Sequence, residues 1–114
     1  MRNTRRISWI KAARNDFESF PAEVQQEAKS ALTVAAEGRK ADTAKPFKGV
    51  DGGVFEIAVR YRGNAYRVIY AVQLGADIVV VDAFQKKSKT GIKTPQVDVD
   101  RIRQRIKRLK EALR

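Results

Sequence analysis

Three apolar stretches of strand length follow one another in the middle of the chain, the first two with apolar residues at every second position, and this pattern constrains the fold more than any other feature. They are VFEIAVRY at 54–61, AYRVIYAV at 65–72 and DIVVVDAF at 77–84. A repeat of two is that of a β-strand with one face in a core. Short turns, RGN and QLGAD, connect them, and the third stretch is apolar on both faces, as in a central strand. The sequence therefore predicts a three-stranded antiparallel meander.

The segment before the meander predicts one strand and two helices. RRISWI alternates and indicates a short edge strand over 6–10, and Ala13, Phe17 and Phe20 recur at helical spacing. A second helix is expected to open at Pro21 and to end at Gly38 as a left-handed cap. Its apolar face is predicted to hold Val24, Ala28, Ala31, Leu32 and Ala35. The following run, 39–53, is rich in Gly and charge and is predicted to be a connection without an element of its own.

The last part of the chain predicts an amphipathic helix. Thr94 is expected to be its N-cap and Pro95 its first residue. Apolar residues then repeat at steps of three and four positions, at Val99, Ile102, Ile106, Leu109 and Leu113. The remaining surface of this helix is basic, so we expect a buried apolar stripe and a basic outer face.

These elements predict a single α+β domain over residues 1–114, in the order β-α-α-β-β-β-α. We expect an antiparallel sheet with the helices packed on one face, which leaves the other face partly open. Strand alternation is expected to place Arg60 and Arg67 side by side, in pairing register, on that open face. A lysine-rich stretch, AFQKKSKTGIKTP at 83–95, leaves the neighbouring strand beside them. The cations are thus expected to form a phosphate-binding surface.

The charge balance favours a polyanionic partner. The chain has 24 Lys and Arg against 13 Asp and Glu, a formal net charge of +11. Cysteine is absent, so the sequence offers no thiol or zinc-thiolate chemistry. The apolar runs, such as Ile78 to Val81, are far too short to cross a bilayer. We therefore expect a cytoplasmic protein without a membrane partner.

Three stretches carry a resemblance to a known family: KPFKGVDGGVFEI, RGNAYRVIYAV and AFQKKSKTGIKTPQVDVDRIRQRIKRL. They resemble the RelE/ParE superfamily of type II toxin-antitoxin toxins, and specifically its phage-derived HigB-like branch, over most of the chain. The resemblance implies a microbial-RNase-like α+β fold and metal-independent, ribosome-dependent cleavage of mRNA that inhibits translation. It also implies a cognate antitoxin, the ribosome and mRNA as partners, and neither a metal nor a small-molecule cofactor.

RNA cleavage without a metal needs a base for the 2′-hydroxyl, an acid for the leaving oxygen and cations at the phosphate. Histidine, the usual choice, is absent. We expect Arg67 to hold the scissile phosphate and Lys86 and Lys87 to serve as general acid and transition-state stabiliser. The base is open between Asp82, where HigB-like members often have histidine, and Glu56, where RelE-type enzymes have a lysine.

Further contacts to RNA are expected around this centre. Lys89 and Lys93 are candidates for the RNA backbone, Arg60 for a second phosphate, and Tyr66 for stacking on a base. Two alternatives remain open. If the chain is not a nuclease, it is either a gyrase inhibitor like members of the ParE branch or a basic RNA-binding module without activity. The absence of the strand lysines favours the gyrase inhibitor.

Overall fold

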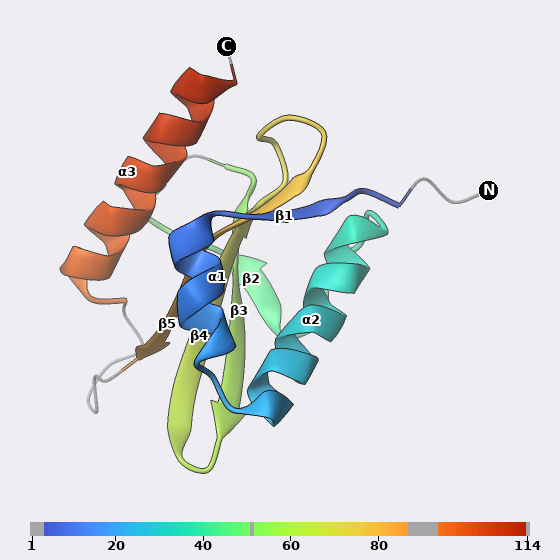
Figure 1. Ribbon diagram of the computed structural model, residues 1–114, viewed down its shortest axis with the longest axis vertical. Helices are drawn as coiled ribbons and strands as arrows, with labels where there is room; N and C mark the ends of the chain where they lie inside the picture. The colour runs from blue at the N-terminus through green and yellow to red at the C-terminus, as the bar shows by residue number, and fades with distance from the viewer. Residues whose placement is uncertain (1–3, 51, 87–93, 114) are drawn as a thin grey trace.

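A five-stranded sheet runs through the part of the chain that the computed structural model describes, residues 4–50, 52–86 and 94–113 (Figure 1). The spatial order of the strands is β1-β5-β4-β3-β2. Along the chain the elements are β1 Ile7–Trp9, α1 Lys11–Glu18, α2 Ala22–Ala36, β2 Ala44–Pro46, β3 Val54–Tyr61, β4 Asn64–Ala71, β5 Ile78–Lys86 and α3 Gln96–Ala112. The α+β class and the expected order are confirmed, with one short strand added.

The predicted meander is the centre of this sheet. β3 pairs with β4 and β4 pairs with β5, both antiparallel. Arg62 and Gly63 connect β3 to β4, and both have positive φ, 50° and 80°. That backbone is the one that a two-residue hairpin turn requires, and Gly adopts it without steric cost.

The edges of the sheet differ from the prediction. β2 lies inside the run predicted to be a connection and pairs antiparallel with β3. β1 pairs with β5 in parallel, so the sheet is mixed rather than wholly antiparallel. Thr94 is not the N-cap of α3; Pro95 is, and the Thr94 hydroxyl instead donates a hydrogen bond to Glu56.

α1 and α2 cover one face of the sheet and enclose the first core. Ile57 and Val59 of β3 and Val68 and Tyr70 of β4 point into it. A series of rings continues this core, since Phe17 lies 4.8 Å from Trp9 and 5.8 Å from Phe20, and Phe20 lies 4.8 Å from Tyr66, between ring centroids. The alternation predicted for these strands is confirmed.

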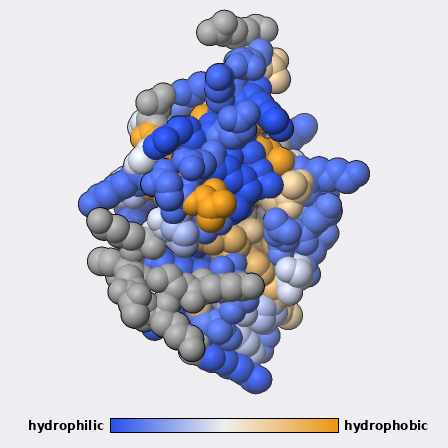
Figure 2. All heavy atoms as spheres, turned by 90° about the vertical axis from the view of Figure 1, so that its left-hand side faces the viewer, coloured by the Kyte–Doolittle hydropathy of each residue, from blue (hydrophilic) through white to orange (hydrophobic). Residues whose placement is uncertain are grey.

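α3 packs on the opposite face, which corrects the expectation that all helices share one face (Figure 1). Its buried Ile102 and Ile106 meet a second apolar cluster, to which the sheet contributes Val54, Ile69, Ala71, Val79 and Val81. The physical reason is that β5 is apolar on both faces, so both faces need a cover. Seen from the side of α3, the surface over this helix is mainly hydrophilic (Figure 2).

A β-bulge interrupts the pairing of β4 with β5. Ile69 pairs with Asp82 and Tyr70 pairs with Val80, so Val81 is an extra residue. Both Val81 and Asp82 therefore lie on the face of α3, and the alternation of β5 changes phase at this point. From Asp82 onward, the even-numbered residues of β5 share a face with Arg67.

In the described part of the chain, no helix combines the length and the apolar character needed to span a membrane.

Candidate functional site

On the face that α3 partly covers, charged side chains follow the apolar cluster along the strands. The pairing registers arrange this surface in rows across β3, β4 and β5. The rows are Glu56, Ile69 and Asp82, then Ala58, Arg67 and Phe84, then Arg60, Ala65 and Lys86. Direct neighbours in a row lie about 5 Å apart, and the charged residues lie in adjacent rows on this one face, where Arg67 of one row contacts Glu56 of the next.

Glu56 joins charged and polar groups from several elements. Only 4% of this residue is exposed. Its carboxylate lies 3.4 Å from Nε of Arg67 and 3.7 Å from Nζ of Lys45 on β2, and it accepts a hydrogen bond of 3.3 Å from the Thr94 hydroxyl. A buried carboxylate is stable only with such partners. Glu56 therefore connects β2, β4 and the segment before α3 at one point.

Lys86 is a buried cation in the same cluster, with 8% of the residue exposed. Burial lowers the pKa of its ammonium group below the usual 10.5, and the positive charge of Arg67 lowers it further. Lys45 and Arg60 act in the same direction, whereas Glu56 opposes them. Lys86 consequently gives up its proton more readily than an ordinary lysine.

Three residues expected at the site, Arg67, Lys86 and Arg60, lie on this one face. The two arginines are diagonal neighbours and not the direct pair that was expected, because Arg67 pairs with Ala58 and Arg60 pairs with Ala65. Arg67 is largely buried, with 12% of its side chain exposed, and Arg60 is exposed. The other expected residues of the lysine-rich stretch, Lys87, Lys89 and Lys93, lie outside the described residues.

Asp82 is fully buried and holds α3 against β5. Nε of Arg101 donates to its Oδ2 at 2.8 Å, and Nη2 of Arg101 donates to Oδ1 at 3.3 Å. Nη1 of Arg105 lies 3.4 Å from the same Oδ2. Both carboxylate oxygens are thus occupied by arginines of the helix. This geometry is that of a structural anchor, and it leaves no side of the carboxylate open to a substrate.

Tyr66 does not lie where its expected stacking role requires. It belongs to the core under α1 and α2, with 7% of the residue exposed and its ring edge against Phe20. Because side chains alternate along β4, Tyr66 points away from the face that carries Arg67. Its position corrects the expectation that Tyr66 stacks on a base.

Two contacts of the cluster could not be found from sequence patterns. Lys45 belongs to the short strand that was interpreted as a connection, and Thr94 was interpreted as a helix cap. Both bind Glu56. The one available signal was Glu56 itself, a carboxylate in a strand next to positions that face the core.

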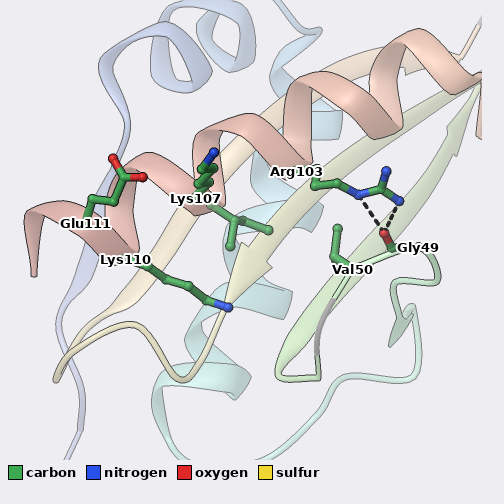
Figure 3. A pocket seen from close by; sticks show the side chains of 7 residues that line it. Gly49, Val50, Arg103, Lys107, Lys110 and Glu111 are labelled. Carbon is green, nitrogen blue, oxygen red and sulfur yellow. Dashed lines mark hydrogen bonds between the residues drawn. The ribbon is translucent and has the colours of Figure 1, made fainter.

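A separate groove of about 620 Å³ lies between α3 and the loop before β3 (Figure 3). Nε and Nη2 of Arg103 donate to the Gly49 carbonyl at 3.1 and 2.5 Å and so bridge helix and loop. The groove is lined by Gly49, Val50, Arg103, Ile106, Lys107, Lys110 and Glu111. None of these belongs to the charged cluster, which consists of Glu56, Arg67, Lys86 and their partners Lys45, Thr94 and Arg60. Among the described residues, no group of His, Cys, Asp and Glu is arranged to hold a metal ion.

The fold and its sheet order are similar to those of a solved toxin of the RelE fold. A mutant of the E. coli toxin RelE in the free state superposes with a TM-score of 0.63 and 17% identity, over 92% of this chain and 97% of that chain. The toxin-antitoxin complex RelBE2 from Mycobacterium tuberculosis matches with a TM-score of 0.49 and 16% identity, over 75% of this chain and 94% of that chain.

The sequence itself matches the family model of phage-derived Gp49-like proteins over residues 15–107. The chain therefore belongs to the Gp49-like family, and its expected place in the RelE/ParE superfamily is confirmed. No curated protein matches the sequence significantly.

Proposed function

We propose that this protein is the toxin of a type II toxin-antitoxin system, of the HigB-like branch, and that it cleaves mRNA on the ribosome without a metal. The observation that carries the proposal is the grouping of Arg67, Lys86 and Glu56 on one face of the sheet, with Lys86 buried and its pKa lowered. This grouping supplies a cation for a phosphate, a proton donor and a carboxylate. The Gp49-like family and the RelE fold support the same assignment.

The cleavage step assigns one role to each group. The substrate 2′-oxygen forms a bond to phosphorus while the bond from phosphorus to the 5′-oxygen breaks. Glu56 takes the proton of the 2′-hydroxyl, Lys86 gives a proton to the leaving 5′-oxygen, and Arg67 stabilises the charge on the phosphate. The products are a 2′,3′-cyclic phosphate and a free 5′-hydroxyl.

Glu56 is a better base than Asp82 in this arrangement. The Asp82 carboxylate is enclosed by Arg101 and Arg105, whose contacts hold the helix in place. Oε2 of Glu56 contacts Arg67, and a substrate phosphate takes the place of this carboxylate at Arg67. Binding of RNA therefore removes the contact of Arg67 with the carboxylate next to the reacting bond, while Lys45 and Thr94 keep the carboxylate in position.

The partners follow from the same proposal. The net charge of +11 favours the ribosome and mRNA, and an acidic segment of a cognate antitoxin competes for this surface. Lys87, Lys89 and Lys93 extend the basic stretch after Lys86 and are proposed to take part, Lys87 in catalysis and the other two in RNA binding. Arg60 is proposed as a second phosphate contact, and the site of action is the cytoplasm.

One experiment tests the proposal. Purified protein is added to a translation system, mRNA ends are mapped, and gyrase supercoiling is assayed in parallel. Codon-aligned cuts that Arg67→Ala abolishes are the expected result. Intact mRNA together with inhibited supercoiling would instead identify a ParE-like gyrase inhibitor. If both mRNA and gyrase are unaffected, the chain is a binding module without activity.

A further inference from the structure

Arg101 of α3 lies beside the charged cluster, over the ring of Phe84. Its Cζ is 5.7 Å from the centroid of this ring, within the range of a cation–π contact. Phe84 is the direct partner of Arg67 in the pairing of β4 with β5. The Arg101 guanidinium therefore lies against an aromatic ring next to the proposed phosphate contact.

The edge of the same guanidinium is occupied by carboxylates. Nε donates to Asp82 at 2.8 Å, and Nη2 contacts Asp82 at 3.3 Å and Asp98 at 2.8 Å. A phosphate would need this donor edge, so Arg101 is poorly suited to be a phosphate clamp. However, 34% of its side chain remains exposed. With respect to the described residues, part of the Arg101 side chain is therefore accessible to a ligand.

A guanidinium plane fixed in this way is a good surface for a nucleobase. Proteins that read unpaired RNA stack splayed bases on aromatic rings and on arginine planes. Asp82 and Asp98 hold the plane in place before any ligand arrives, so little conformational freedom is lost on binding. The aromatic side chain expected to stack, Tyr66, is buried on the other face, whereas Phe84 and Arg101 lie on the face of Arg67.

We propose that Arg101, backed by Phe84, is the stacking platform for an unpaired nucleobase of RNA, adjacent to the phosphate that Arg67 holds. This inference rests on the proposed function, because it takes Arg67 as the phosphate contact. It adds a specificity determinant, since a platform at a fixed place next to the scissile bond distinguishes bases by how well they stack.

The matched variants are Arg101→Lys and Arg108→Lys. The first keeps a positive charge opposite Asp82 but removes the plane. The second makes the same change at an exposed position of the same helix. Phe84→Leu removes the backing ring and keeps an apolar side chain. Thermal unfolding of each variant first establishes that it is folded.

The probe is single-stranded RNA whose target codon carries 2-aminopurine and 2′-deoxy sugars that prevent cleavage, free and in the A site of programmed ribosomes. Wild type and Arg108→Lys are expected to quench the 2-aminopurine fluorescence. Arg101→Lys is expected to bind about tenfold more weakly and to lose the quenching, because stacking on a side chain is worth roughly five- to a hundredfold in affinity.

Each outcome decides the inference. The proposed platform is overturned if Arg101→Lys quenches the fluorescence as strongly as the wild type does. It is also overturned if the wild type quenches neither the free RNA nor the RNA in the A site. If Arg101→Lys does not fold, Phe84→Leu decides in its place, with lost quenching supporting the platform. In parallel, cleavage sites are mapped on RNA whose sugars carry their natural 2′-hydroxyl groups. Wild-type cleavage with unchanged quenching in the variants refutes the platform alone, whereas absent cleavage with Arg101-dependent quenching refutes the nuclease alone.

Discussion

Nε of Arg67 lies 3.4 Å from Oε2 of Glu56, so the proposed phosphate contact is paired with a carboxylate before RNA binds. A phosphate and this carboxylate therefore compete for one guanidinium. The competition links substrate binding to the release of the proposed base, and it can be tested by removing the charge of Glu56 alone.

Glu56→Gln is expected to slow cleavage by about 10²- to 10⁴-fold, the usual contribution of a general base. RNA binding should stay equal or become tighter, because Arg67 loses a competing anion. Single-turnover cleavage on programmed ribosomes, together with binding of a 2′-deoxy substrate, measures both effects. Glu27→Gln, at an exposed position of α2, is the control. An unchanged cleavage rate would limit Glu56 to orienting Arg67.

Lys86→Met is expected to abolish cleavage. It should also raise the free energy of unfolding by about 0.5–2 kcal/mol near neutral pH, because an apolar side chain replaces a buried ammonium group. The cause is the lowered pKa of Lys86, which results from burial and from Arg67. The folded protein is penalised while this lysine is charged, and the penalty fades as pH rises from the folded pKa toward the unfolded value near 10.5. Denaturant unfolding should thus show the wild type approaching the variant in stability at alkaline pH, and a less stable variant would contradict this account.

The pH dependence of cleavage should report the same group. A general acid works while protonated, so the rate should fall as pH rises through the lowered pKa of Lys86, below the ordinary 10.5. Lys86→Arg retains a cation that stays protonated, and its residual rate should show no such fall. Single-turnover rates across alkaline pH measure this difference. Identical profiles for the two proteins would exclude Lys86 as the acid.

Asp82→Ala is expected to destabilise the protein by about 3 kcal/mol, because it leaves Arg101 and Arg105 without their buried partner. Chemical denaturation gives this value, and cleavage is then compared per folded molecule. Asp82→Asn is the matched variant, since it keeps the size and part of the hydrogen bonding. A large loss of cleavage in well-folded Asp82→Asn would return Asp82 to the role of base.

Tyr66→Phe should change cleavage less than about twofold, because the ring lies in the core and not at the RNA-binding face. Tyr66→Ala should instead cost about 3–5 kcal/mol of stability, as expected for an aromatic core residue replaced by alanine. Thermal or denaturant unfolding and codon-mapped cleavage separate the two effects. Loss of cleavage in a stable Tyr66→Phe protein would contradict the core assignment.

The first two strands of the meander were predictable from alternation over eight residues, and the third from its continuous apolar run; β3 occupies the predicted range 54–61. β2 was missed because three residues, Ala44 to Pro46, contain too few alternations to form a pattern. The apolar stripe of α3 predicted which side of the helix is buried. The stripe carries no information on which face of the sheet the helix covers, and for this reason the predicted packing of α3 was wrong.

The site was predictable only where strand parity determines it. The alternation of side chains along the strands placed Arg60 and Arg67 on one face. Tyr66 is two positions from the core-facing Val68, so the same rule would have placed its ring under the helices. The contacts of Glu56 with Lys45 and Thr94 join segments far apart in the chain. No local pattern encodes such contacts, because they arise only when the sheet and α3 have assembled.

The extra residue at Val81 has a consequence for mutation. If the same residues formed a regular strand without the bulge, alternation would direct the side chains of Phe84 and Lys86 toward α1 and α2, and Ala83 toward the side of Arg67. Deleting Val81 would therefore leave Phe84 and Lys86 on their present face, whereas inserting one residue after Asp82 would turn Lys86 toward the aromatic core. A one-residue insertion at this point is thus a more severe lesion than most substitutions, although it removes no charged side chain.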